Sequence, residues 1–129
     1  MAHTPEEQRN LDLVLTMYRE VLIKMDASKV DKYIAPNYLQ HSSLAPPGRE
    51  ALKQFLQMIR TESPDARTDI KRAFVDGDHV VCHVHVMRFP GDPGLAVVDI
   101  FRVAGNFIVE HWDVLMEVPA TTLNTNPMF

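Results

Sequence analysis

Cysteine is almost absent from this chain, since Cys82 is the only one among its 129 residues. No disulfide can form within one copy, which fits a reducing compartment. Long apolar runs are also missing, because none approaches the roughly 20 residues needed to span a bilayer. The N-terminal residues are polar and acidic and carry no apolar signal-peptide core. We therefore expect a cytoplasmic protein that has no membrane partner.

A basic stripe, the usual mark of a nucleic-acid-binding protein, is missing too. Lys and Arg total 13 against 17 Asp and Glu, and the net charge is −4. Nucleic acid is therefore not an expected partner. The chain has 46% hydrophobic and 23% charged residues, as ordinary globular proteins do, and its length is that of one domain. It contains no repeat or linker, so we predict a single domain over residues 1–129.

The first half of the chain carries helix signals. Thr4 can cap a helix that begins at Pro5, and Glu7 can complete a capping box. The apolar stripe that follows has helical spacing and consists of Leu11, Val14, Leu15, Tyr18, Leu22 and Met25. A short second helix is predicted from Ser28 to near Pro36. A third is predicted over about 49–60.

From Ala66 onward the apolar period changes to two, which is typical of strands. The predicted strands are about Arg67–Val75, His79–Phe89, Leu95–Val103 and Phe107–Val118. Turns rich in Gly, Pro, Asp and Asn join them, and such short connections imply antiparallel pairing. The sequence therefore predicts an α+β fold in which three N-terminal helices pack on one face of a four-stranded antiparallel sheet. If the sheet curves strongly, that face becomes the wall of a pocket.

Strand register decides which side chains share a face, because a slip of one residue exchanges the two faces. A five-residue loop at 90–94 would place His85 opposite Asp99. A three-residue loop at 104–106 would place Asp99 opposite His111. One face would then collect the odd-numbered residues His83, His85, Met87, Val97, Asp99, Phe101, Val109, His111, Asp113 and Leu115. A two-residue loop at 105–106 would instead turn Asp99 to the side of Trp112.

Two interpretations of these faces stay open at this point. The even-numbered residues Cys82, Val84, Val86, Val98 and Ile100 are more uniformly apolar and could form the core, leaving His83 and His85 in solvent. Asp is unfavourable in the middle of a strand, however, which favours a function for Asp99 and Asp113. A carboxylate on an apolar wall beside a histidine can exchange protons near neutral pH. That would be acid–base chemistry with neither a metal nor a covalent nucleophile.

Three strings in this order make the chain resemble a known family. Tyr38-Leu39-Gln40-His41, Asp99-Ile100-Phe101-Arg102 and Glu110-His111-Trp112-Asp113-Val114 are similar to the SnoaL-like polyketide cyclase family of the nuclear-transport-factor-like superfamily. The resemblance implies a cone-shaped fold of helices around a curved sheet, a hydrophobic pocket and commonly a homodimer joined through the outer sheet. It also implies that a pocket aspartate is the general acid/base of an intramolecular aldol ring closure. That role maps onto Asp113, with Asp99, His111 and His41 as its neighbours.

We accordingly expect a cofactor-independent enzyme that acts on a small hydrophobic carbonyl compound and is of cyclase, aldol-condensation or isomerase type. The residues expected to bind the substrate are His83, His85, Met87, Phe101, Tyr38 and Phe55. One alternative is a non-catalytic domain of the same fold that binds a small apolar ligand, although desolvated carboxylates are costly there. Another is a metal enzyme in which His83 and His85 bind the ion with Asp99 or His111.

Overall fold

The structure is a computed structural model and describes residues 2–129. Helix α1 (Pro5–Met17) continues into a π-helical turn (Tyr18–Leu22), and a 3₁₀ turn (Ala27–Lys29) leads into the short helix α2 (Val30–Tyr33). Strand β1 (Ile34–Gln40) and helix α3 (Arg49–Glu62) follow. The rest of the fold consists of strands β2 (Arg67–Asp76), β3 (His79–Met87), β4 (Leu95–Ala104) and β5 (Phe107–Glu117). No helix within residues 2–129 is long and apolar enough to cross a membrane.

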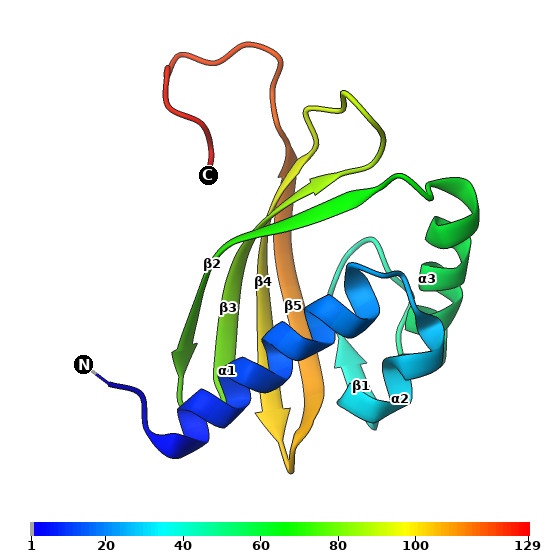
Figure 1. The fold of residues 1–129 in the computed structure, drawn as a ribbon, viewed down its shortest axis with the longest axis vertical. Helices are drawn as coiled ribbons and strands as arrows, with labels where there is room; N and C mark the ends of the chain where they lie inside the picture. Colours follow the sequence, from blue (N-terminus) through cyan, green and yellow to red (C-terminus); the bar gives the residue numbers. More distant parts are fainter. Residues whose placement is uncertain (1) are drawn as a thin grey trace.

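The start of α1 is fixed by the capping box that the sequence predicts. Thr4 Oγ1 accepts a hydrogen bond from the Glu7 backbone N–H, and the Glu7 carboxylate accepts one from the Thr4 N–H. The second Glu7 oxygen accepts from the N–H of Gly77, in the turn between β2 and β3. The helix start is therefore tied to the sheet, which sets the direction in which α1 crosses it (Figure 1).

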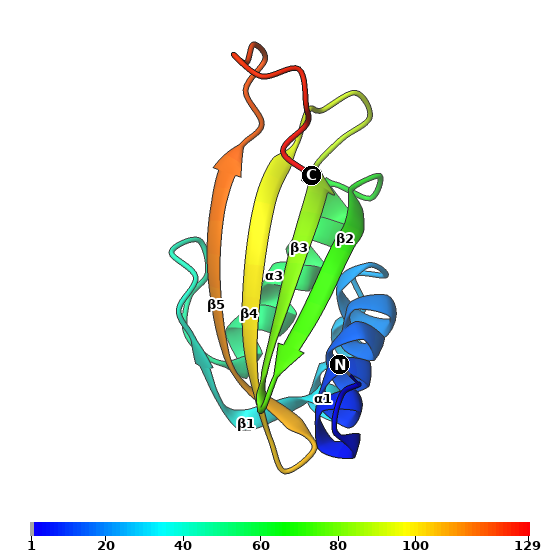
Figure 2. The ribbon, with the colours of Figure 1, turned by 90° about the vertical axis from the view of Figure 1, so that its left-hand side faces the viewer.

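The five strands form one curved sheet with the order β1-β5-β4-β3-β2. The four strands of the C-terminal half pair antiparallel. In Figure 2, α3 lies behind the strands and α1 lies along the right-hand side of the sheet. Side chains of both helices line the same cavity, on one face of the curved sheet. We call the helix-covered face the inner face and the opposite one the outer face. The core lies between the inner face and α1, where Val14, Met17, Tyr18, Val21, Val80, Cys82, Val84 and Ile108 are buried. The predicted α+β fold is thereby confirmed.

Strand β1 was not predicted, and it adds a parallel strand to the edge of the expected meander. It pairs with β5, with Leu39 opposite Glu110 and Gln40 opposite His111. Pro36 was taken to end a helix, and it lies instead within β1, where the pairing with β5 is irregular between Ile34 and Leu39. Pro is tolerated at such a place because an edge strand or bulge leaves a backbone N–H unused.

The register between β3 and β4 differs from the predicted one. Strand β3 ends at Met87, Val86 pairs with Leu95, and Asp99 lies opposite Cys82, whereas His85 was expected there. The loop over 88–94 is longer than the five residues expected, and Asp92 holds it together by accepting hydrogen bonds from the N–H groups of Arg88 and Gly94. On β3 it is therefore the even-numbered residues that face inward, as one of the two open interpretations held.

The turn between β4 and β5 also differs, yet it preserves the predicted grouping of Asp99 with His111 and Asp113. Gly105 and Asn106 form a two-residue turn, and both have positive φ, at 57° and 65°. With this turn and no further change, Asp99 would lie opposite Trp112, on the face away from His111 and Asp113. A register shift next to Arg102 leaves Val109 as an extra residue in β5, and this bulge restores the alternation. Asp99 then pairs with Asp113, and Phe101 pairs with His111.

Candidate active site

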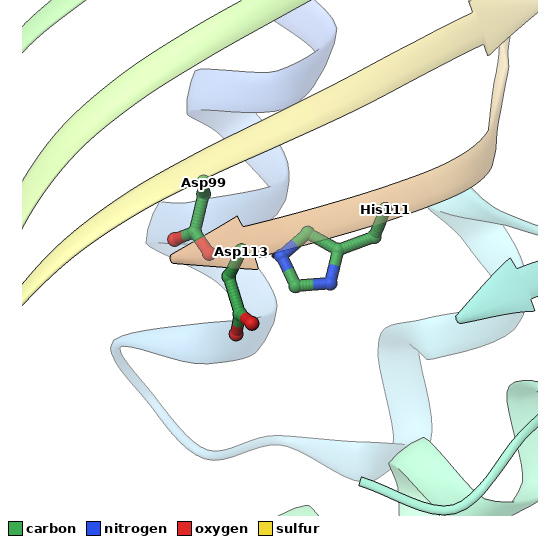
Figure 3. Close-up of side chains that lie close together, drawn as sticks. All are labelled: Asp99, His111 and Asp113. Carbon is green, nitrogen blue, oxygen red and sulfur yellow. Dashed lines mark hydrogen bonds and ion pairs between the residues drawn. The ribbon is translucent and has the colours of Figure 1, made fainter. Parts of the chain in front are cut away.

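A cavity of about 280 Å³ lies between the inner face of the sheet and the helices. Most of its walls are apolar and come from α1, α3 and the strands, including Met17, Phe55, Leu56, Val97, Phe101 and Leu115. One group of polar side chains belongs to this lining and is connected by hydrogen bonds or strand pairing: Tyr18, Tyr38, Gln40, Asp99, His111 and Asp113. Figure 3 shows Asp99, His111 and Asp113 converging from β4 and β5. This polar cluster in an apolar cavity is the candidate active site.

Asp99 is buried in the middle of β4, with 9% of its surface exposed, and its two oxygens have separate partners. The Tyr18 hydroxyl donates to Oδ2, and Oδ1 lies 2.8 Å from His111 Nε2. Burial, followed by the charge of Asp99, raises the pKa of Tyr18 well above its usual value, so the phenol stays protonated and remains a donor. Asp99 is thus held in place by two hydrogen bonds.

His111 has a partner at each ring nitrogen. Nε2 faces Asp99, and Nδ1 lies 2.6 Å from Gln40 Oε1. The ring also stacks on Phe101, with centroids 4.7 Å apart. These contacts fix the imidazole plane and leave neither nitrogen free to reach a ligand in the cavity. His111 therefore acts on the site through Asp99.

Asp113 is the free carboxylate of the cluster. It is the cross-strand partner of Asp99, it is half-buried and it lines the cavity. Within residues 2–129 no hydrogen-bond or ion-pair partner contacts its side chain, in contrast to Asp99. A carboxylate with open lone pairs at the wall of an apolar cavity can accept a proton from a bound molecule and return it.

The hydroxyl of Tyr38 and the thiol of Cys82 are two further ionisable groups on this side of the sheet. The Gln40 amide donates to the Tyr38 hydroxyl at 2.9 Å, so the phenol hydrogen of Tyr38 is free to point elsewhere. Burial, followed by the charge of Asp99, raises the pKa of Tyr38, which keeps that hydrogen in place. Cys82 also faces inward, but burial raises the pKa of its thiol to about 12, which excludes a thiolate nucleophile near neutral pH.

The same three side chains are the ones that could hold a metal ion. Ligand atoms of Asp99, His111 and Asp113 all lie within 4.8 Å of one another. The alternative of a metal site that combines His83 and His85 with Asp99 or His111 is wrong, because His83 and His85 lie on the outer face.

His41 was expected beside Asp113, and the structure places it on the outer face instead. Its Nε2 lies 2.7 Å from Glu110 Oε2, and its ring stacks on Trp112 at 5.0 Å. The reason is the twofold period of an extended chain: Gln40 points into the cavity, so the next residue points away. A catalytic role for His41 at this cavity is therefore ruled out.

His83, His85 and Met87 were expected to line the pocket and do not, because the β3–β4 register turns them to the outer face. His83 bonds with Arg72, and His85 Nε2 lies 2.7 Å from the Pro93 carbonyl. The C-terminal Phe129 stacks on both imidazoles, with the centroids 4.2 Å apart at His85.

Three of the residues expected to bind substrate, Tyr38, Phe55 and Phe101, do line the cavity. Their role in substrate binding stays a prediction. Sequence reasoning missed Tyr18 and Gln40. Tyr18 was visible only as part of the apolar stripe of α1. Gln40 appeared only within the string Tyr38-Leu39-Gln40-His41, and its direction could not be predicted because β1 itself was not predicted.

Comparisons with known proteins agree with this architecture. The family model for SnoaL-like polyketide cyclases matches residues 12–121. A candidate polyketide cyclase from Acidithiobacillus ferrooxidans has a similar structure, with a TM-score of 0.70, 24% identity, and coverage of 89% of this chain and 91% of that one. No curated protein matches the sequence.

Two further solved structures have similar folds at lower identity. A candidate SnoaL-like polyketide cyclase from Jannaschia gives a TM-score of 0.74 at 18% identity, covering 89% of this chain and 90% of that one. A candidate ketosteroid isomerase from Kribbella flavida gives 0.73 at 18% identity, covering 92% and 86%. Identities this low show the fold alone. The family model spans most of the chain, and the chain therefore belongs to the SnoaL-like polyketide cyclase family.

Proposed function

We propose that this protein is a cofactor-independent acid–base enzyme that acts on a small hydrophobic carbonyl compound. One observation carries the proposal: Asp113 is an unpartnered carboxylate at the wall of an apolar cavity, next to the hydrogen-bonded Asp99–His111 pair. The family includes cyclases and isomerase-like enzymes, and both reaction types begin with the same step, removal of a proton from the carbon next to a carbonyl.

In the proposed reaction the Asp113 carboxylate takes this proton, and the electron pair of the C–H bond moves onto the carbonyl to form an enolate. In a ring closure the enolate carbon attacks a second carbonyl of the same molecule, and the protonated Asp113 returns its proton to that oxygen. In an isomerisation Asp113 returns the proton to a different carbon. The Tyr38 hydroxyl is the donor for the enolate oxygen, because Gln40 occupies its lone pair and leaves its hydrogen available.

The cavity favours a small, neutral and mostly apolar substrate. Its volume of about 280 Å³ is at the lower end of ligand pockets. The two carboxylates disfavour an anionic group near the reacting carbon, and Met17, Leu56 and Val97 offer only apolar contact.

The Asp113→Asn variant tests the assignment. The change keeps the size of the side chain and removes the proton acceptor, so kcat should fall by about 100-fold or more on any accepted substrate. Turnover is measured on a panel of enone and poly-β-carbonyl compounds with a chelator present. Glu110→Gln is the matched control: it lies on the same strand, faces outward, and should leave kcat within about twofold.

Unchanged turnover in Asp113→Asn would remove the assigned role. If the wild-type protein binds such compounds and converts none of them, the protein is a binding domain instead.

A homodimer joined through the outer face is part of the proposal. This face exposes apolar side chains that a monomer would leave in water: Phe74, Val98, Val114 and Met116. Among them Val114, on β5, is 73% exposed. A twofold axis there would cover the same patch on both copies. In a sedimentation experiment the wild-type protein should therefore be a dimer and Val114→Glu a monomer. Leu123→Glu, in the C-terminal tail, should remain a dimer. A wild-type protein that sediments as a monomer contradicts the homodimer.

A further inference from the structure

We infer that Gln40 is a positioning residue that sets the hydrogen positions on His111 and on Tyr38 together. This inference rests on the proposed acid–base function, since it assigns how the partners of that site are held ready. Gln40 is the last residue of β1 and pairs with His111 across the parallel β1–β5 contact. Its amide touches both groups, at 2.6 Å to His111 Nδ1 and 2.9 Å to the Tyr38 hydroxyl.

A third contact determines which end of the Gln40 amide faces which partner. The backbone N–H of Ser42 lies 3.0 Å from Gln40 Oε1. A backbone N–H can only donate, so the atom that it meets must be the amide oxygen and not the NH₂ group. The chain itself therefore fixes the amide orientation, which hydrogen-bond networks otherwise leave to inference.

For His111 the consequence is a hydrogen on Nδ1. The amide oxygen of Gln40 has only lone pairs to offer, so an unprotonated Nδ1 at 2.6 Å would face it lone pair against lone pair. With Nδ1 protonated, the ring directs Nε2 at Asp99 Oδ1 in every protonation state of the pair. The Asp99–His111 contact then shares one proton, and Asp113 is left as the only carboxylate free to accept one from the substrate.

For Tyr38 the consequence is a hydrogen directed away from Gln40. The amide NH₂ donates to the phenol oxygen, so the phenol must use its own hydrogen on another acceptor. Tyr38 lines the cavity, where a bound substrate would present its carbonyl oxygen to this hydrogen. One amide thus prepares both the electrostatic partner and the oxyanion donor.

Nitrogen-15 NMR of the histidine rings in the full-length protein tests the first half without any substrate. At neutral pH His111 Nδ1 should give the signal of a protonated nitrogen, with His111→Asn used to assign it. An unprotonated Nδ1 in the wild-type protein would overturn the inference. Because this readout needs no turnover, it stands even if the proposed reaction fails, and so separates the two.

Two Gln40 variants test the second half. Gln40→Met is similar in length but lacks the amide, so His111 should lose its single Nδ1–H form and show a mixture of tautomers. Gln40→Glu keeps an acceptor for Nδ1 but has no donor for Tyr38, so the His111 signal should stay while the phenol hydrogen turns toward the new carboxylate. On any accepted substrate kcat should then fall about tenfold or more in both, with KM changed far less.

Circular dichroism and the thermal midpoint verify that both variants are folded. An unchanged His111 signal in Gln40→Met overturns the role at His111. An unchanged kcat in Gln40→Glu overturns the role at Tyr38.

Discussion

The two faces of the sheet carry the same kind of pair with different consequences. On the inner face His111 lies 2.8 Å from Asp99, and on the outer face His41 lies 2.7 Å from Glu110. The two carboxylates are similarly buried, with Asp99 12% and Glu110 14% exposed, but the inner histidine is 11% exposed and His41 is 44% exposed. Asp99 has the Tyr18 phenol as its second partner, while Glu110 has the guanidinium of Arg102.

This comparison shows that a histidine–carboxylate contact does not by itself make a reactive site. Outside, the Arg102 guanidinium neutralises the carboxylate, and the histidine is open to water. Inside, the same contact is enclosed with an open carboxylate, Asp113, beside an apolar cavity. Enclosure gives the inner pair its chemical use, because electrostatic interactions are stronger where water is excluded.

The largest expected difference between the faces concerns packing. Val80 is fully buried on the inner face and Val98 is 37% exposed on the outer face. Val80→Ala should lower the free energy of unfolding by about 2–3 kcal/mol, from lost burial and the cavity left behind. In the Val114→Glu background, where the proposed dimer contact is removed, Val98→Ala should cost less than about 0.5 kcal/mol. Urea denaturation measures both costs, and a cost at Val98 in that background comparable to the cost at Val80 would contradict the difference between the two faces.

The next difference concerns the phenol that holds Asp99. Tyr18→Phe removes a donor to a buried carboxylate and should cost about 1–3 kcal/mol of unfolding free energy. Tyr33→Phe is the matched control, because Tyr33 is also buried and its hydroxyl makes no hydrogen bond within residues 2–129. Equal costs for the two variants would mean that the Tyr18–Asp99 contact contributes nothing to stability.

Tyr18 also predicts how stability changes at alkaline pH. Its pKa is raised in the folded protein above the usual 10.0, so its contribution is fully present below pH 10 and is lost as the pH rises beyond that value. Unfolding measured from pH 8 to 11 should therefore show a steeper loss in the wild-type protein than in Tyr18→Phe. Parallel curves would contradict the assignment.

The smallest expected effect belongs to the outer pair. The Arg102 guanidinium, and then His41, hold the pKa of Glu110 below its usual 4.5. The stability that the ionised Glu110 side chain gives the folded protein is therefore present above pH 4.5, and it is lost as the pH falls below that value. Glu110→Gln should flatten this acid loss in thermal melts, and 1 M salt should reduce the difference because His41 and Arg102 are partly open to solvent. Acid losses of equal steepness in the wild-type protein and in Glu110→Gln would contradict the assignment.

The sequence determined the parts of the fold that depend on neighbouring residues. The Thr4–Glu7 capping box, the apolar stripe of α1 and the strands β2–β5 follow from local chemistry and periodicity. Strand β1 escaped this reasoning because its pairing with β5 joins residues far apart in the chain, and its Pro36 suggested a break. Local signals contain no information on such a contact.

The candidate site shows the same division. Asp99 and Asp113 could be singled out because a mid-strand Asp needs a reason. The histidine that lies beside these two carboxylates could not be singled out from strand patterns alone. A loop longer than expected turned His83 and His85 to the outer face, and a bulge at Val109 kept His111 on the inner face. Each shift of register by one or a few residues decides on which face of the sheet a side chain lies. Only the tertiary packing of the helices on the sheet determines which of the two faces is enclosed.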